Sequence, residues 1–135
     1  MNYFLDTNII IYAVKNTYPN LVKKFEETPS YNIVVPAIVK AELEYGASKS
    51  ANYKKTIDLY NKFINIYNII SFTDKETIFY GNIRTELERK GTLIGANDML
   101  IAATVLSHNG VLVTHNVKEF SRISNFKIED WTKAD

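Results

Sequence analysis

Short apolar runs alternate with longer amphipathic segments along the whole 135-residue chain. Each short run is followed by polar residues or proline, a pattern typical of strands buried in a sheet. The runs predict strands at 3–5, 32–35, 66–71 and 111–114, and an edge strand or packed tail at 127–131. Strands that alternate with helices indicate an α/β fold with a mainly parallel central sheet and right-handed crossovers.

The longer segments repeat apolar residues at helical spacing. They predict helices at 9–14, 19–27, 37–48, 52–65, 73–90 and 98–106. We expect Thr7 or Asn8 to cap the first helix, a capping box at 73–76, and Asn97 to cap the last helix. No repeat, low-complexity segment or flexible linker interrupts the pattern, so we expect a single domain spanning residues 1–135.

Polar side chains follow two of the predicted strands. Asp6 comes directly after the first strand, and His115, Asn116 and Glu119 follow the strand at 111–114. Ligands of open α/β sheets bind at the carboxyl ends of the strands, so Asp6 is a candidate ligand-binding residue. It can equally serve as the cap of the helix that follows, and this stretch alone does not separate the two interpretations.

Two acids on predicted helices add to this picture. The residues three and four positions from Glu42 are uncharged and mostly apolar, whereas Glu44 has surface neighbours and a partner in Lys40. An apolar setting is costly for Glu42 unless the carboxylate is paired or binds metal; the alternative is a place at the rim, pointing outward. Asp98 lies in the first turn of its helix, where the helix dipole alone can explain it.

Composition narrows the chemistry of these acids. The chain has no cysteine, which excludes thiolate metal sites, and its net charge of +1 supplies no general surplus of cations. Converging carboxylates repel one another, and a divalent cation is the usual resolution. Oxygen ligands without a His or Cys cluster favour Mg²⁺ or Mn²⁺, which indicates metal-dependent phosphodiester chemistry. We expect a cytoplasmic protein without a signal peptide or a membrane span.

Six stretches together carry a resemblance to a known family. They read FLDTN at 4–8, AELEYGA at 41–47, RTELERKG at 84–91, GAND at 95–98, VTHNVKEF at 113–120 and IEDW at 128–131. The chain resembles PIN-domain ribonucleases, specifically VapC-type toxins of bacterial toxin–antitoxin pairs, over essentially its whole length. The resemblance implies a three-layer α/β/α sandwich and Mg²⁺-dependent endoribonuclease activity. The subgroup that it resembles most cleaves initiator tRNA in the anticodon stem-loop.

The resemblance also implies roles for single residues. Asp6, Glu42 and Asp98 match the acidic metal-binding core of the family, and Glu119 stands as the fourth acid. Asn116 lies where other members carry an acid, so it contributes a neutral ligand or a hydrogen bond. Asn8 and Thr114 resemble residues that orient the carboxylates.

Partners are implied in the same way. The family forms homodimers and pairs with a VapB-like antitoxin protein that covers the acidic site. For the RNA backbone, candidate contacts are Arg84, Arg89, Lys90 and His115, and the two arginines come first because guanidinium groups suit phosphate.

Two other functions fit part of the pattern. In a phosphatase or phosphoacceptor domain Asp6 would be the nucleophile, and Thr114 would suit such a site, but no lysine follows a predicted strand end. In a non-catalytic module that binds RNA or protein the acids would have no role, although an acidic cluster without a cation destabilises a fold.

Overall fold

A computed structural model describes residues 1–134, and in them five strands form one parallel sheet in the order β3-β2-β1-β4-β5. The strands are β1 (Tyr3–Leu5), β2 (Ile33–Pro36), β3 (Asn68–Ile70), β4 (Val111–Val113) and β5 (Ile128–Glu129). All five lie within or beside the predicted ranges and are mostly shorter than predicted. The prediction of a parallel α/β sheet is confirmed.

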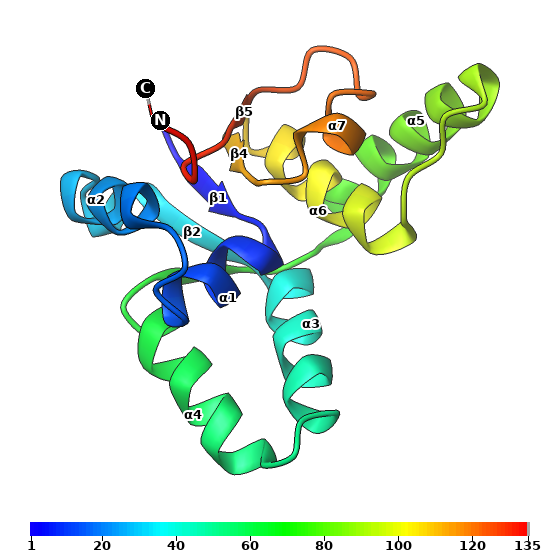
Figure 1. Cartoon of the computed structure of the whole chain (residues 1–135). Coiled ribbons are helices and arrows are strands. Elements are labelled where there is room, and N and C mark those ends of the chain that lie inside the picture. Colours follow the sequence, from blue (N-terminus) through cyan, green and yellow to red (C-terminus); the bar gives the residue numbers. More distant parts are fainter. Residues whose placement is uncertain (135) are drawn as a thin grey trace.

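Helices cover both faces of this sheet, giving three layers (Figure 1). They are α1 (Thr7–Val14), α2 (Pro19–Glu27), α3 (Ala37–Ser48), α4 (Tyr53–Ile64), α5 (Asp74–Lys90), α6 (Ala96–Ser107) and the short α7 (Val117–Phe120). On one face α1, α2 and α4 pack together, and α5 packs along α6 on the other. The α3–α4 hairpin projects beyond the carboxyl edge of the sheet (Figure 1).

The strand order reverses its direction between β1 and β4. From β1 the chain moves outward to β2 and β3, then returns to β4 and β5 on the other side of β1. In open α/β sheets such a reversal leaves a crevice at the carboxyl ends of the two central strands. Asp6 follows β1 and Thr114 follows β4. The Asp6 N–H donates to the Val113 carbonyl at 3.0 Å, which fixes the two strand ends side by side.

One continuous apolar core lies between the layers. Helix α6 is buried on most sides, as its sequence predicts, with six residues buried between Met99 and Val105. Trp131 is 2% exposed and packs its ring against Tyr3 and Phe25, with centroids 5.3 and 5.4 Å away. The C-terminal segment is therefore both a short edge strand, β5, and a tail anchored by Trp131.

Several predicted helix caps are wrong. Asp6 caps α1 by accepting from the Thr7 N–H at 2.9 Å, so neither Thr7 nor Asn8 is the cap. Helix α6 begins at Ala96 with Gly95 at the cap position, which places Asn97 inside the helix. At α5 Thr73 occupies the predicted N-cap position, but its hydroxyl donates to the Glu76 carboxylate at 2.7 Å and makes no capping bond to the backbone.

One further feature was not predicted. Helix α7 contains four residues, too few to show a helical period in the sequence. No helix within residues 1–134 has both the length and the apolar composition to cross a membrane.

Gly110 gives the fold a specific test, because a Cβ atom built on it would lie 2.4 Å from Phe4 Cε1. Phe4 is 1% exposed in the core, so the ring has little room to move. We expect Gly110→Ala to lower the free energy of unfolding by about 1–3 kcal/mol, measured by urea denaturation. Gly81→Ala on α5 is the control: nothing lies within 4 Å of its Cβ position, and a gain of about 0.5–1 kcal/mol is expected. Equal stability of the two variants would contradict this packing.

Candidate metal centre at the carboxyl edge of the sheet

Four acids reach the carboxyl edge of the sheet from four different elements. Asp6 follows β1, Glu42 lies on α3, Asp98 on the first turn of α6 and Glu119 on α7. The negative charges of Asp6, Glu42 and Glu119 all raise the pKa of Asp98, so each of these three acids lies within electrostatic reach of Asp98. The fold therefore brings together the acids that the sequence singled out.

Asp6 is the most buried of the four, at 6% exposed. Its Oδ1 accepts the Thr7 N–H at 2.9 Å, and its Oδ2 accepts the Thr114 hydroxyl at 2.7 Å. The Thr114 oxygen accepts the Asn116 N–H at 2.9 Å, so a chain of hydrogen bonds runs from Asn116 to Asp6. Burial raises the pKa of Asp6 above its usual value, the hydrogen bonds from Thr114 and Thr7 oppose the rise, and the charge of Glu42 adds to it.

Glu42 lies at the rim of the site, partly exposed. Its Oε1 accepts the Thr7 hydroxyl at 2.5 Å, and its Oε2 accepts the Asn97 amide at 3.5 Å. Tyr45, expected on the same apolar face, is 65% exposed, so the apolar surroundings predicted for Glu42 are incomplete.

Thr7 is the residue that the sequence argument missed. Its backbone N–H donates a hydrogen bond to Asp6 and its hydroxyl donates one to Glu42, so one residue orients two carboxylates. Its position directly after Asp6 was the only signal in the sequence. Asn8, predicted for this role, is exposed, and its side chain forms no hydrogen bond with another residue in 1–134. The predicted orienting role of Asn8 is therefore not supported by a contact.

Asp98 lines a hollow of about 380 Å³ together with Glu42 and residues 95–97. Burial raises the pKa of Asp98 to about 6, and the charges of the neighbouring acids contribute. Glu119 accepts a hydrogen bond from the Asn116 side-chain amide at 2.7 Å. Asn116 therefore contacts both halves of the site, through its backbone to Thr114 and through its side chain to Glu119.

Cationic side chains do not neutralise this cluster. Within residues 1–134 no lysine or arginine forms an ion pair with any of the four acids. Arg84 pairs with Glu88 at 2.9 Å, and Lys90 lies 3.4 Å from Glu86, both on the exposed surface of α5. Arg89 is exposed as well. The predicted RNA contacts of these residues stay predictions.

The donor set fits a hard divalent cation that keeps much of its water. All the candidate ligands are oxygen atoms, which suits Mg²⁺ or Mn²⁺. Among residues 1–134, no group of three or more His, Asp or Glu side chains is arranged so that it could hold a metal ion as it stands. Mg²⁺ usually binds through one or two carboxylates and several waters, so this looser arrangement matches its preference.

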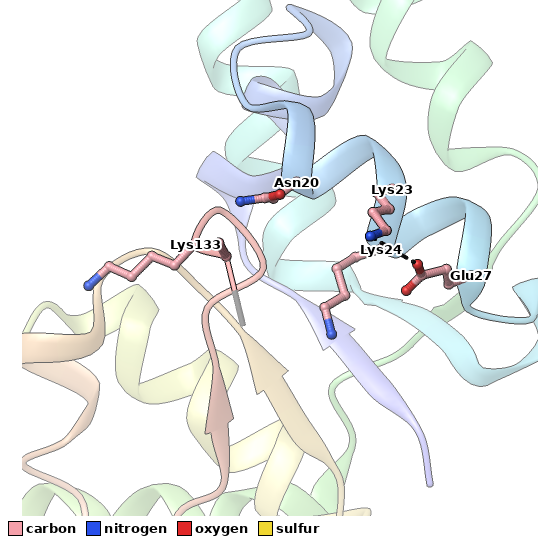
Figure 2. A pocket seen from close by; sticks show the side chains of 6 residues that line it. Asn20, Lys23, Lys24, Glu27 and Lys133 are labelled. Carbon is pink, nitrogen blue, oxygen red and sulfur yellow. Dashed lines mark ion pairs between the residues drawn. The ribbon is translucent and has the colours of Figure 1, made fainter.

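A second hollow, of about 290 Å³, lies between α2 and the C-terminal tail (Figure 2). Its lining includes Lys23, Lys24 and Lys133, and Lys23 pairs with Glu27 at 3.9 Å. None of the four acids lines it. The basic hollow is therefore separate from the carboxylate site.

Comparison with known proteins gives concordant matches. The family model of the PIN domain matches residues 3–125. The chain is 43% identical to Ribonuclease VapC2 of Rickettsia felis, covering 98% of this chain and 100% of that protein. It is 35% identical to the tRNA(fMet)-specific endonuclease VapC of Salmonella typhimurium, covering 97% and 98%. A crystal structure of VapBC2 from Rickettsia felis, bound to a DNA fragment from the VapBC2 promoter, is similar to this structure with a TM-score of 0.89. The two chains are 41% identical, and the match covers 97% of this chain and 99% of that one.

Replacing Thr114 tests the hydrogen-bond chain to Asp6. Thr114→Val keeps the shape of the side chain but leaves both Asp6 Oδ2 and the Asn116 N–H without this partner. We expect the free energy of unfolding to fall by about 1–3 kcal/mol in urea denaturation. In the control Thr104→Val the lost hydroxyl only donates to a carbonyl of its own helix, Leu100, and a smaller loss is expected. If both variants lose the same free energy of unfolding, the hydrogen bond from Thr114 to Asp6 does not stabilise the fold more than an ordinary bond within a helix.

The raised pKa of Asp98 predicts a pH dependence of stability. The folded protein holds this proton more tightly than the unfolded chain, whose carboxyl titrates near 3.8. The contribution of Asp98 to the stability of the metal-free protein should therefore fall as pH rises from about 4 to about 6 and remain lower above that. Asp98→Asn cannot ionise, so we expect its melting temperature to rise relative to wild type across this window in EDTA.

Two controls accompany this measurement. Asp58→Asn removes an exposed carboxylate on α4, which pairs with Lys54, and should not reproduce the trend. Above pH 6, excess Mg²⁺ should reduce the difference in melting temperature between wild type and Asp98→Asn, because a bound cation stabilises the ionised carboxylate. If the difference in melting temperature between wild type and Asp98→Asn does not change with pH, the electrostatic coupling of Asp98 to the other acids is contradicted.

Proposed function

The chain belongs to the PIN-domain family, within its VapC-type ribonucleases, and we propose that Asp6, Glu42, Asp98 and Glu119 bind the divalent cation with which it hydrolyses RNA. PIN-domain ribonucleases are metal-dependent, and Mg²⁺ is the proposed cation, with Mn²⁺ as a substitute. One observation carries the proposal: Asp6, Glu42 and Glu119 lie within electrostatic reach of Asp98, and none of the four acids has an ion-pair partner among residues 1–134. Such a cluster is unfavourable unless a cation joins it.

The protein's own side chains give this cluster its geometry. Thr7 and Thr114 hold the two oxygens of Asp6 in one orientation, and Thr7 also holds Glu42. Asn116 fixes Glu119. When bound, the cation supplies an activated water and offsets the charge that develops on the scissile phosphate. The hydrogen bonds reduce the reorganisation that the carboxylates would otherwise undergo.

The substrate that we propose is tRNA, in particular the anticodon stem-loop of initiator tRNA. Support comes from a relative that is named as a tRNA(fMet)-specific endonuclease and is 35% identical over nearly the full chain. Cleavage of this tRNA would inhibit translation, which is the action of a toxin in the cytoplasm. Arg84, Arg89 and Lys90 are proposed to contact phosphates. The ion pairs of Arg84 and Lys90 are exposed, and such pairs are weak enough to exchange for RNA.

The proposed protein partners are a VapB-like antitoxin and a second copy of the chain. The structural relative at a TM-score of 0.89 is a VapBC2 assembly on promoter DNA, and this chain matches 99% of the compared chain. We propose that the antitoxin covers the acidic edge of the sheet and thereby blocks access to the carboxylates.

The phosphoacceptor alternative gains no support from the contacts. Both oxygens of Asp6 accept hydrogen bonds, from Thr7 and Thr114, and no lysine among residues 1–134 bonds to it. A nucleophilic aspartate of that class needs a nearby lysine and an open carboxylate face. The non-catalytic alternative is decided by the activity assay below.

Two glutamates on α3 provide a matched test of the nuclease. Glu42 belongs to the acidic site, whereas Glu44, two residues further along the same helix, accepts a hydrogen bond from the Tyr53 hydroxyl. We expect the purified, antitoxin-free chain to cut total tRNA into discrete fragments with Mg²⁺ or Mn²⁺ and not with EDTA. Glu42→Gln and Asp98→Asn should lose more than about a hundredfold in rate, because each removes a proposed metal-binding charge. Glu44→Gln should cut at the wild-type rate.

The outcomes separate the hypotheses. Equal rates for Glu42→Gln and Glu44→Gln would remove Glu42 from the site. Full activity of Asp98→Asn would refute the metal-centre assignment. Folded wild-type protein that cuts neither tRNA nor other cellular RNA, and whose melting temperature does not respond to Mg²⁺ or Mn²⁺, would support the non-catalytic module. Sequencing of the fragment ends identifies the cleaved bond.

A further inference from the structure

His115 occupies a distinctive position beside the acidic site. Its neighbours Thr114 and Asn116 contact Asp6 and Glu119, respectively. The chain bends at His115, and the side chain of His115 contacts a different set of residues from these acids. Its ring lies against Tyr12 and Tyr18, with centroids 6.0 and 5.6 Å away. The imidazole therefore borders the site on the side of α1 and α2.

The hydrogen bonds of His115 fix which ring nitrogen carries the proton. His115 Nδ1 lies 3.1 Å from Asp130 Oδ2 and 3.0 Å from the Thr132 hydroxyl oxygen. The Thr132 hydroxyl donates its own hydrogen to Asp130 Oδ1 at 2.6 Å, so its oxygen acts as an acceptor toward His115. Both neighbours of Nδ1 are thus acceptors, which places the proton of the neutral imidazole on Nδ1.

Asp130 is a dependable acceptor. Its side chain is 9% exposed. Burial raises the pKa of Asp130, but hydrogen bonds from Thr132 and His115 outweigh that effect and leave the pKa below its usual value. The carboxylate stays ionised at neutral pH and holds the histidine ring in one orientation, as paired carboxylates do for catalytic and metal-binding histidines.

In the neutral ring with its proton on Nδ1, the remaining nitrogen of His115, Nε2, carries a lone pair. It forms no hydrogen bond with any residue in 1–134, and 39% of the side chain is exposed. A neutral imidazole in this tautomer presents an acceptor to the solvent. The ribose 2′-hydroxyl is a donor that RNA carries and DNA lacks, and proteins use it to distinguish the two.

We propose that His115 Nε2 accepts a hydrogen bond from a ribose 2′-hydroxyl next to the scissile phosphate, so that the Asp130–His115 pair selects RNA over DNA. The inference rests on the proposed nuclease function, because it places the RNA strand across the acidic site. Tyr12 and Tyr18 support the imidazole from the side of the helices. Thr132 completes the orientation of the pair through its bonds to both members.

The first experiment reads the tautomer in the protein alone. The chain has two histidines, His108 and His115, so ¹⁵N-histidine NMR gives two ring patterns, and His108→Gln assigns them. At about pH 8, where an ordinary imidazole is neutral, we expect the His115 ring to carry its proton on Nδ1. Asp130→Asn should weaken this preference. A proton on Nε2 in the wild-type protein would overturn the proposal.

The second experiment measures the choice of sugar. In an Asp98→Asn background, which prevents cleavage, fluorescence anisotropy at fixed salt compares ribo and deoxyribo versions of the initiator-tRNA anticodon stem-loop. His115→Phe keeps an aromatic ring against Tyr12 and Tyr18 but removes both nitrogens. We expect it to reduce the preference for the ribo version by about five- to tenfold, the effect of one lost hydrogen bond, with deoxyribo affinity unchanged.

Other outcomes overturn the proposal. If His115→Phe lowers the affinity for both oligonucleotides equally, His115 contacts a phosphate. If His115→Phe leaves the preference for the ribo version unchanged, or if the Asp98→Asn protein shows no such preference, the 2′-hydroxyl is not recognised by His115. Failure of the nuclease proposal is distinguishable: wild type would then cut no RNA, yet the ribose preference and its loss in His115→Phe would remain. If wild type cuts RNA while His115→Phe binds both forms as before, only the subsite is refuted.

Discussion

Repulsion among carboxylates at the carboxyl edge of the sheet is the constraint on which the rest of this structure depends. Asp6, Glu42, Asp98 and Glu119 come from positions far apart in the sequence, and the parallel sheet with its reversal between β1 and β4 brings them together. A large apolar core is needed to hold such an arrangement, because the acids themselves oppose it. Buried strands of three or four residues and the almost wholly buried α6 provide that support.

Neutral donors, rather than cations, make the arrangement tolerable. Each of Asp6, Glu42 and Glu119 accepts a hydrogen bond from a threonine or asparagine side chain. Such donors fix a carboxylate without cancelling its charge, so the negative potential at the edge is retained. A lysine or arginine in the same place would stabilise the apo fold more strongly but would compete with a cation. Thr7, Thr114 and Asn116 therefore favour the binding of a cation at the expense of the stability of the cation-free fold.

The sequence predicts the elements better than it predicts the contacts at their ends. Apolar runs locate all five strands, and strand ends locate Asp6 and Thr114, because both signals depend on burial. The predicted helix caps fail for a different reason. Neighbouring short polar residues, as at 6–8 or 97–98, can each bond the same free N–H groups, and only tertiary contacts select one. Thr7 illustrates this, since its hydroxyl is taken by Glu42, 35 residues away. The hydrogen bond of Glu44 with Tyr53, where Lys40 was expected, likewise depends on how α3 and α4 pack, and helix α7 is too short to show a helical period.

The segment that leaves β4 shows how a short stretch of chain serves two purposes. Thr114 and Asn116 face the acids, and His115, between them, faces Asp130, Thr132 and two tyrosines. The bend at His115 thus separates carboxylate positioning from the second polar cluster without any insertion. Because Thr114 N–H is bonded to the Glu129 carbonyl at 3.0 Å, β5 sets the position of both sides at once. The edge strand and its Trp131 anchor are therefore part of the site's architecture, although they contribute no acid to it.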